Sequence, residues 1–483
     1  METLTLDLDA TMRAHRDDAA APAATGPAIS AAVAPAPVTT EPEGGDTLRQ
    51  NPVPWQDWVA YGLSFAGLAT CPPHLEALTA GSPRSTTLTT HRPAPRWPDV
   101  THRAPHAPDV THRAPHALDV THRAPHAPDP SRRGHRAPSP VPSHRAPRTR
   151  TLTMHSYREP RPGRRWRQLL EATWAAYRAW YLREGEGARP SLAECETALR
   201  THLPALVPTW ERLVAEAAKV DGVDRDLAAR LLSGWCVPAY ATGCSQVALT
   251  EGAPALVRNY DYDPHLFEGV VASTRYAARD VLGTSDLLWG LLDGVNGDGL
   301  AVSLTWGGRP GDGPGFAIPV VVRALLETCA TVAEAVEALA TIPVAQAYNL
   351  TLVDASGAHA TVFVAPGEAP VVSALPVATN HRLTEVEFAG PAAAVASMPR
   401  QQRLLGVLAD KGAATGDGKR SAIVGAMLEP PVRATAYTRG FGTLYTAEYL
   451  PGEGSVVYHW PGRSWRRGLT DPDEQITVEL PDA

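Results

Sequence analysis

The residue best placed to do chemistry is Cys244, in the segment Ala-Thr-Gly-Cys-Ser-Gln at 241–246. A free thiol has a pKa near about 8.5 and is mostly protonated at neutral pH, so a nucleophilic cysteine needs a base. Cutting the Gly243–Cys244 peptide bond would create an α-amino group with a pKa of about 7.7–8.0 on the same residue. The pattern therefore predicts a self-cleaving enzyme whose thiol is the nucleophile and whose new amine is the base.

Two charged residues follow a short turn later, in the segment Arg-Asn-Tyr-Asp at 258–261. A fixed cation such as Arg258 beside a thiol favours the thiolate. Residues three apart on a strand point to opposite faces, so we expect a bulge or twist to turn Arg258 or Asp261 inward. A papain-like alternative would need a histidine as base, and His381 is the candidate. Cys244 as an inert buried cysteine and Asp261 as a turn cap are the competing structural interpretations.

The order and spacing of four segments resemble the N-terminal nucleophile hydrolases, in the branch of acyl-coenzyme A:6-aminopenicillanate acyltransferases. Choloylglycine hydrolases and penicillin V acylases are more distant relatives. The likeness covers roughly residues 165–460. It implies an α+β fold with four layers, αββα, made as a precursor. The segments are Gly243-Cys244-Ser245, Arg258-Asn259-Tyr260-Asp261, residues 294–303, and Ala378-Thr-Asn-His381.

The resemblance also implies a role for each matching residue. Cys244 would be the nucleophile through its sulfur and the base through its freed amine. Arg258 matches the arginine beside the thiol, and Asp261 matches the aspartate that holds the nucleophile's amine. Asn380 matches the asparagine whose amide faces the oxyanion, where one donor typically contributes about 10²–10³ in rate.

Other site residues are less well marked by the sequence. Ser303-Leu-Thr-Trp306 has no asparagine where relatives carry a second oxyanion donor, so Thr305 or a backbone amide would substitute. Arg439 is the candidate for a late assisting arginine. Trp306 and Tyr262 could line an acyl pocket, although core packing explains them equally well.

The elements that position these residues follow from periodicity. Apolar residues at helical spacing predict helices within 163–240, including a Ser191…Glu194 capping box. Alternation after Cys244 predicts a β-hairpin with its turn at 251–254. Further strands are expected near 267–274, 285–293, 299–306, 348–353, 358–364, 371–379, 443–449 and 454–459, and helices at 318–329, 331–341, 397–411 and 418–427.

The predicted organisation has three parts. Residues 1–153 would form a disordered Pro/His/Arg-rich tail with ten-residue repeats such as Thr-His-Arg-Ala-Pro-His-Ala-Pro-Asp-Val at 101–110, since prolines in such numbers exclude helix and sheet. Alternatively this tract is untranslated and the protein starts at Met154. Residues 154–243 would be a helical pro-segment, and residues 244–483 the catalytic core.

The composition restricts the function classes. The chain has 483 residues and a net charge of −7, without a nucleic-acid footprint. Its 5 cysteines are scattered, which indicates neither a zinc site nor a disulfide framework. We expect no metal, no cofactor, no signal peptide and no membrane span, and a cytoplasmic location.

The sequence thus predicts an enzyme that cleaves a linear amide through a thioester on Cys244. The acyl group would pass to water or, in a transferase, between an acyl thioester and an amine co-substrate. The cleaved N-terminal fragment would stay bound. Two alternatives remain: an uncleaved, non-catalytic ligand-binding relative, and an interaction protein that acts through its tail. Neither the substrate nor the oligomeric state can be assigned from the sequence.

Overall fold

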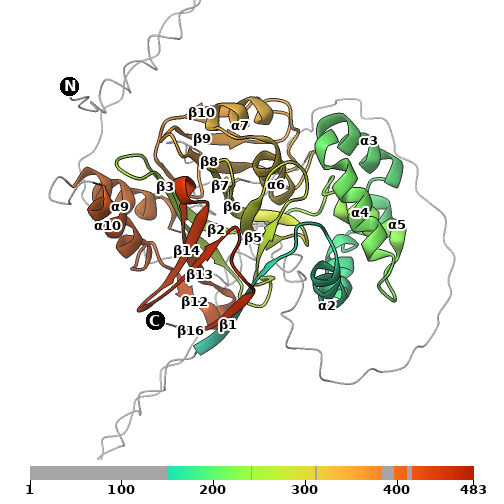
Figure 1. Ribbon diagram of the computed structural model, residues 1–483, viewed down its shortest axis with the longest axis horizontal. Coiled ribbons are helices and arrows are strands. Elements are labelled where there is room, and N and C mark those ends of the chain that lie inside the picture. Colours follow the sequence, from blue (N-terminus) through green and yellow to red (C-terminus); the bar gives the residue numbers. More distant parts are fainter. Residues whose placement is uncertain (1–148, 241, 310–312, 383–395, 411–415, 483) are drawn as a thin grey trace, which may run out of the picture. The chain divides into compact units, whose positions relative to one another are not determined.

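A computed structural model describes residues 149–240, 242–309, 313–382, 396–410 and 416–482. Within these ranges the fold is mixed α+β, with two β-sheets and several helices (Figure 1). The predicted tail repeats, and the disorder predicted for residues 1–148, lie outside the described residues.

The smaller sheet carries the predicted hairpin. β2 (Gly243–Leu249) and β3 (Ala255–Tyr262) pair antiparallel around the turn that Glu251-Gly-Ala-Pro predicts. This seven-stranded sheet has the order β11-β2-β3-β13-β14-β15, with β12 paired to β13. Its other strands are β11 (Val377–Ala378), β12 (Thr435–Ala436), β13 (Phe441–Leu450), β14 (Ser455–Trp460) and β15 (Arg463–Gly468).

The larger sheet has nine strands in the order β10-β9-β8-β7-β6-β5-β4-β1-β16. Most neighbours are antiparallel, but β1 pairs parallel to β4. The strands are β1 (Thr149–Arg158), β4 (Val270–Thr274), β5 (Val281–Asp286), β6 (Gly290–Asn296), β7 (Leu300–Trp306), β8 (Tyr348–Asp354), β9 (His359–Val364), β10 (Val371–Ser373) and β16 (Glu474–Pro481).

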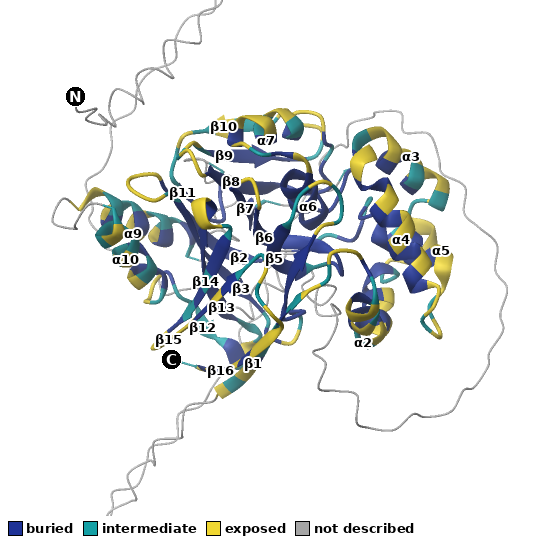
Figure 2. Ribbon diagram, in the orientation of Figure 1, coloured by how far each residue is buried: buried dark blue, intermediate teal, exposed yellow. Residues whose placement is uncertain are grey.

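The two sheets face each other, since β2 and β3 contact β7 and β8 across the core. Helices α6 (Ile318–Thr328) and α7 (Val332–Leu339) pack on the nine-stranded sheet. On the seven-stranded sheet lie α9 (Ser397–Ala409) and α10 (Asp417–Met427), which share an apolar cluster with β2 and β3. Both faces of the central strands are therefore covered, which explains why β2 and β3 are buried along their whole length (Figure 2).

Between β1 and the hairpin, the described residues form four α-helices, as the periodicity predicts: α2 (Arg164–Tyr181), α3 (Leu192–His202), α4 (Val207–Ala217) and α5 (Arg225–Leu232). The Ser191…Glu194 capping box at the start of α3 is confirmed. The aromatic stripe of α2 is core: Trp166, Tyr177 and Trp180 are each at most 2% exposed.

The prediction that this segment is only helical, and that the tail extends to residue 153, was wrong. β1 begins at Thr149 and pairs residues 149–156 with β16 as well as lying beside β4. Its alternating Leu152 and Met154 are fully buried. A chain starting at Met154 would lack half of this strand.

Two other differences have local causes. The strand predicted at 285–293 is a hairpin, β5–β6, whose turn places Leu287 and Leu288 at φ 56° and 69°. Turns of this kind usually carry Asn or Gly, so two leucines gave no turn signal. The strand predicted at 371–379 is divided, because β10 ends one sheet and β11 begins the edge of the other. This crossing brings the residues after β11 beside β2.

Candidate active site

Cys244 is the second residue of β2 and is fully buried, with 0% of its surface exposed. It pairs with Tyr260 of β3, and its Sγ lies 3.0 Å from Nη2 of Arg258 on the same strand as Tyr260. The Thr242 hydroxyl lies 3.6 Å from the sulfur. The structure thus brings the predicted nucleophile and the predicted cation together in the core between the sheets.

The guanidinium of Arg258 is held by a buried carboxylate that the sequence did not reveal. Asp293, on β6 of the facing sheet, pairs with Nη1 of Arg258. The same carboxylate accepts hydrogen bonds from the Tyr445 hydroxyl at 2.6 Å and the Thr284 hydroxyl at 2.6 Å. The guanidinium carbon lies 4.9 Å from the centre of the Tyr260 ring. Arg258 is therefore fixed with its second nitrogen directed at the sulfur.

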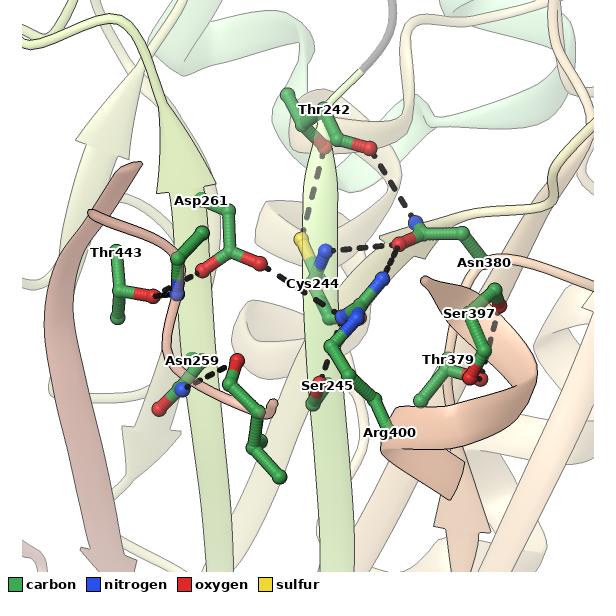
Figure 3. A network of polar contacts seen from close by, with 12 residues as sticks. Thr242, Cys244, Ser245, Asn259, Asp261, Thr379, Asn380, Ser397, Arg400 and Thr443 are labelled. Atoms are coloured by element: carbon green, nitrogen blue, oxygen red, sulfur yellow. Dashed lines mark hydrogen bonds and ion pairs between the residues drawn. The ribbon is translucent and has the colours of Figure 1, made fainter. Parts of the chain in front are cut away.

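Asn380 holds the backbone on both sides of the predicted cleavage point (Figure 3). Its Oδ1 accepts the backbone N–H of Cys244 at 3.1 Å. Its Nδ2 donates to the carbonyl of Thr242 at 3.2 Å and to the carbonyl of Trp306 at 3.0 Å. An amide donor is therefore already placed beside the peptide segment that ends at the nucleophile.

The position of Asn380 depends on neighbours that bind its flanking backbone. Nδ2 of Asn349, on β8, donates to the carbonyl of Thr379 at 2.8 Å and to that of His381 at 2.9 Å. Gly308 has φ +77°, and a Cβ there would lie 2.1 Å from the carbonyl oxygen of Asn380. Only glycine permits this approach. His381 bonds through its ring nitrogens to α9 instead of to the thiol.

Arg258 and Asp261 lie on opposite faces of β3. The pairing of β2 with β3 is continuous, so the expectation that a bulge turns one of them inward was wrong. The irregularity in this part of the sheet falls in β13, between Thr443 and Tyr445. Asp261 instead faces the α9 side, where it accepts the Thr443 hydroxyl at 2.6 Å.

Phe441 and Asp261 both pack closely against Gly243, which leaves little room for a side chain at this position. A Cβ on Gly243 would lie 2.6 Å from the Phe441 ring and 3.2 Å from Oδ2 of Asp261. The first distance is shorter than real carbon contacts allow. The glycine before the nucleophile thus lets the carboxylate of Asp261 lie directly beside the peptide backbone that would be cut.

Arg400, on α9, completes the cluster and was missed by the sequence analysis. It is 2% exposed, and its Nη2 donates to Oδ1 of Asn380 at 2.6 Å. Its Nη1 donates to the Ser245 hydroxyl at 2.7 Å and to the carbonyl of Cys244, and lies 3.6 Å from Oδ2 of Asp261 (Figure 3). One guanidinium therefore connects the predicted oxyanion asparagine, the nucleophile's backbone and the predicted aspartate.

A signal for Arg400 exists in the helical periodicity. Ser397, Arg400, Leu404 and Val407 are the buried residues of α9, at the spacing of one helical face. A charged residue on an otherwise apolar face needs a buried partner. The spacing alone, however, does not identify that partner as Asp261.

The remaining candidates are placed differently. Thr305 is fully buried on β7, and its hydroxyl has no hydrogen-bond partner among the described residues. Trp306 contributes its backbone carbonyl to Asn380, and Tyr262 packs beside Tyr260 with ring centres 5.7 Å apart. Arg439 is not brought to this cluster: it is exposed in the short helix η6 (Tyr437–Arg439).

Burial dominates the electrostatics of the intact site. Burial raises the pKa of the Cys244 thiol, and the nearby guanidinium of Arg258 offsets part of this rise. Burial likewise raises the pKa of Asp261, against the lowering effect of Arg400. The thiol of the intact chain is therefore mainly protonated, and a base is needed to activate it.

In the ranges that the structure describes, no group of three or more His, Cys, Asp or Glu side chains is arranged to hold a metal ion. The helices of the same ranges are all too short or too polar to cross a membrane. The groups gathered around Cys244 are its thiol, the guanidinium groups of Arg258 and Arg400, the carboxylates of Asp261 and Asp293, and the amide of Asn380.

Residues 248–465 match the family model described as acyl-coenzyme A:6-aminopenicillanic acid acyl-transferase. Among curated proteins, no sequence matches this chain.

Several solved structures are similar to part of the chain. A mutant of the conjugated bile acid hydrolase from Clostridium perfringens aligns with 14% identity and a TM-score of 0.35, covering 49% of this chain and 96% of that one. An N-acylethanolamine-hydrolyzing acid amidase ortholog from Caenorhabditis elegans aligns with 15% identity and a TM-score of 0.32, covering 43% of this chain and 93% of that one. Penicillin V acylase from Agrobacterium tumefaciens aligns with 18% identity and a TM-score of 0.29, covering 45% of this chain and 74% of that one.

Proposed function

Since residues 248–465 match the acyl-coenzyme A:6-aminopenicillanic acid acyltransferase family model, we propose that this chain is a self-activating cysteine amidohydrolase or acyltransferase. The match supports an enzyme of the N-terminal nucleophile type that acts on amide bonds by hydrolysis or acyl transfer. The finer fold assignment, an αββα sandwich, is supported by two facing sheets with helices on their outer sides.

The first step proposed is cleavage of the Gly243–Cys244 bond. The sulfur of Cys244 bonds to the Gly243 carbonyl carbon, the C–N bond breaks, and the thiol proton ends on the nitrogen of Cys244. The product is a thioester between Gly243 and Cys244 with a free α-amino group. Water then opens the thioester, which leaves a carboxylate on Gly243 and a thiol on Cys244.

In turnover, the same sulfur would attack the carbonyl of a linear amide. The α-amino group of Cys244 takes the thiol proton and passes it to the departing amine, so the amide nitrogen leaves as a neutral amine. The acyl group remains on sulfur as a thioester. Water, or an amine in a transferase, then accepts the acyl group and regenerates the thiol. A small-molecule amide is the substrate that this cycle requires.

The contacts around Cys244 support a role for each neighbour. Arg258, at 3.0 Å from the sulfur, stabilises the thiolate. Asn380 supplies the amide donor for the tetrahedral oxyanion. Arg400 orients Asn380 and compensates the charge of Asp261, which lies beside the new amine. We propose Arg400 for the assisting position for which the sequence suggested Arg439.

The unpartnered hydroxyl of Thr305 supports the proposal that it is the second oxyanion donor. A buried hydroxyl without a partner among the described residues costs about 1–3 kcal/mol, and an acceptor that forms during the reaction would offset this cost. The strand β7 that carries Thr305 contacts β2, which carries Cys244. An oxyanion formed between these strands would give the hydroxyl an acceptor.

The N-terminal fragment, residues 1–243, is proposed to stay with the catalytic fragment after cleavage. Its β1 is hydrogen-bonded on both sides, to β4 and to β16, and its α2 presents a buried aromatic face. Separation would expose this surface and two strand edges to water.

The observation that carries the proposal is the pair of contacts on Cys244: Sγ with Arg258 and the backbone N–H with Asn380, behind a glycine against which Phe441 and Asp261 pack closely. The test is intact-mass measurement of purified wild-type protein. We expect two fragments, the second beginning Cys-Ser-Gln-Val. The Cys244→Ala variant should remain one chain, and Cys329→Ala, which removes another buried thiol, should be cut like the wild type.

A second candidate is an uncleaved protein that binds ligands without catalysis. The complete burial of Cys244 and the raised pKa of its thiol favour this alternative. A wild-type chain that stays intact for days, and forms no acyl adduct on Cys244 with a library of amides, would support it and contradict our proposal.

A further inference from the structure

Two acidic side chains, Glu268 and Asp286, lie together near the start of the catalytic fragment. Glu268 precedes β4 and is 6% exposed, and Asp286 is the last residue of β5. One oxygen of Glu268, Oε1, accepts the Tyr177 hydroxyl and the backbone N–H of Leu288, the latter at 2.7 Å. Its other oxygen, Oε2, is buried and has no partner with full hydrogen-bond geometry among the described residues, although the Ser285 side chain lies close enough to lower the pKa of Glu268.

These carboxyls differ from the other buried acids of the core. Asp293 pairs with Arg258, Asp261 lies within 3.6 Å of Arg400, and Glu327 lies 3.5 Å from Arg323. Within the described ranges, by contrast, neither Glu268 nor Asp286 makes an ion pair with arginine, lysine or histidine. Burial, followed by the neighbouring Glu268, raises the pKa of Asp286 to about 7. Without a cation nearby, such a buried pair avoids the cost of ionisation by keeping a proton, and a bound cation would instead favour its ionised form.

The side chain that now reaches this pair is Tyr240. Its hydroxyl donates to Oδ2 of Asp286 at 3.4 Å, and its carbonyl accepts the Tyr348 hydroxyl at 3.2 Å. Its ring lies between two others, with centres 6.3 Å from Trp180 and 6.4 Å from Tyr348. Tyr240 thus occupies an aromatic site with an acidic end.

This site lies on the acyl side of the bond to be cut. Tyr240 precedes Gly243 by three residues, a reach of about 10 Å in extended chain. Burial raises the pKa of Tyr348, and the charges of Cys244 and Asp286 raise it further, so the sulfur and the acid lie close to the same ring. The proposed thioesters of self-cleavage and of turnover form on the same sulfur. Their acyl groups would therefore contact the same surrounding side chains. The position of Tyr240 therefore marks where the far end of a substrate's acyl group would lie.

Building on the proposed function, we propose that the site of Tyr240 is the acyl-binding subsite, and that Glu268 and Asp286 select acyl groups ending in an ammonium group. An ammonium group offers three donors and a charge, so it can satisfy Oε2 of Glu268 and neutralise the pair. The rings of Trp180 and Tyr348 favour a cation between them. A purely aliphatic acyl group would displace Tyr240 and leave Asp286 without that donor.

The test uses the processed wild-type enzyme and two matched series of acyl anilides. One series carries ω-amino acyl chains of increasing length, and the other carries neutral chains in which a methyl group replaces the amine. We expect the best amino member to exceed its neutral isostere by about tenfold or more in kcat/KM, the size of one charge-assisted hydrogen bond. A wild-type preference for the neutral series, or equal kcat/KM values for the two series, would overturn the inference.

Two variants assign the selectivity to the acids. In Asp286→Asn and Glu268→Gln, the ratio of amino to neutral kcat/KM should fall toward one, while Asp298→Asn, on the exposed β6–β7 turn, should keep the wild-type ratio. An unchanged ratio in both acid variants would overturn the inference. Failure of either variant to fold leaves the wild-type ratio as the deciding measurement.

The outcomes separate this inference from the proposed function. A thioester adduct on Cys244, detected by intact mass with both series at similar rates, would contradict the ammonium preference alone. The absence of any adduct or turnover with either series would contradict the proposed enzyme and the subsite together.

Discussion

The two faces of the β2–β3 pair carry different groups around the Gly243–Cys244 peptide bond. The face between the sheets holds the sulfur of Cys244, with Arg258 and its partner Asp293. The face toward α9 holds Asp261 and Arg400, which contact the Cys244 carbonyl, Asn380 and the hydroxyls of Ser245 and Thr443 (Figure 3). On the first face the charges act on the reactivity of the thiol. On the second they act on the position of the bond. Substitutions on the two faces should therefore fail in different ways.

The largest effect is expected on the positioning face, from Arg400→Met. Removing this cation leaves Asp261 buried without compensation, which should lower the free energy of unfolding by about 3–5 kcal/mol and abolish cleavage. Chemical denaturation and intact mass measure the two effects. Arg403→Met, on the exposed side of α9, should change neither. Normal cleavage by a stable Arg400→Met variant would show that this face has no positioning role.

Gly243→Ala should stop or strongly slow cleavage because its Cβ would meet the Phe441 ring at 2.6 Å. The bond must shift away from Asn380 or the ring must move. A time course of fragment appearance on gels measures the effect. Gly425→Ala, where a Cβ meets nothing within 4 Å, is the matched control and should be cut at the wild-type rate.

On the reactivity face, Arg258→Gln should change the pH dependence of the thiol. Arg258 lowers the pKa of Cys244, so its loss raises that pKa and reduces the thiolate fraction at neutral pH. The rate of Cys244 alkylation in processed protein should fall, and its pH profile should move to higher pH. Arg258→Lys keeps a cation and should move the profile less. Coincident profiles for all three proteins would contradict the assignment.

Thr305→Val should lower kcat by about 10²–10³-fold while leaving KM nearly unchanged, because a single oxyanion donor contributes mainly in the transition state. Kinetics with a chromogenic amide provide the measurement. Thr351→Val removes another buried hydroxyl that has no partner in the described part of the chain, on the neighbouring β8, and should leave kcat unaltered. Equal kcat losses in the two variants would indicate a general packing effect.

The smallest effect is expected from deleting residues 1–148, which leaves β1 complete from Thr149. Cleavage and amide turnover should then match the full chain within about twofold. A large loss of activity would favour the alternative that the tail carries the function. Deletion through residue 153 should instead destabilise the protein, because it removes Leu152 and part of the β1–β16 ladder.

The sequence predicted the hairpin, the helices on both sides of it and the residues that meet at the site, because local periodicity and a family pattern both mark them. Cys244, Arg258, Asp261 and Asn380 do come together. The pattern could not identify Asp293 or Arg400 as site residues, because each reaches the site through an ion pair with a residue of β3, and sequence spacing does not reveal such pairs. The Leu287–Leu288 turn gave no signal because tertiary packing, not residue preference, holds those left-handed conformations.

The strand β1 lies between two strands that both belong to the other side of the cleavage point. Residues 244–483 expressed by themselves would lack the strand that joins the edge strand β16 to β4 in the larger sheet. We therefore expect that the proposed mature enzyme is not obtained by starting translation at the nucleophile. The fold requires the chain to be synthesised whole, because β1 pairs with β16, the last strand. Cutting the bond would then mark a molecule whose assembly is already finished.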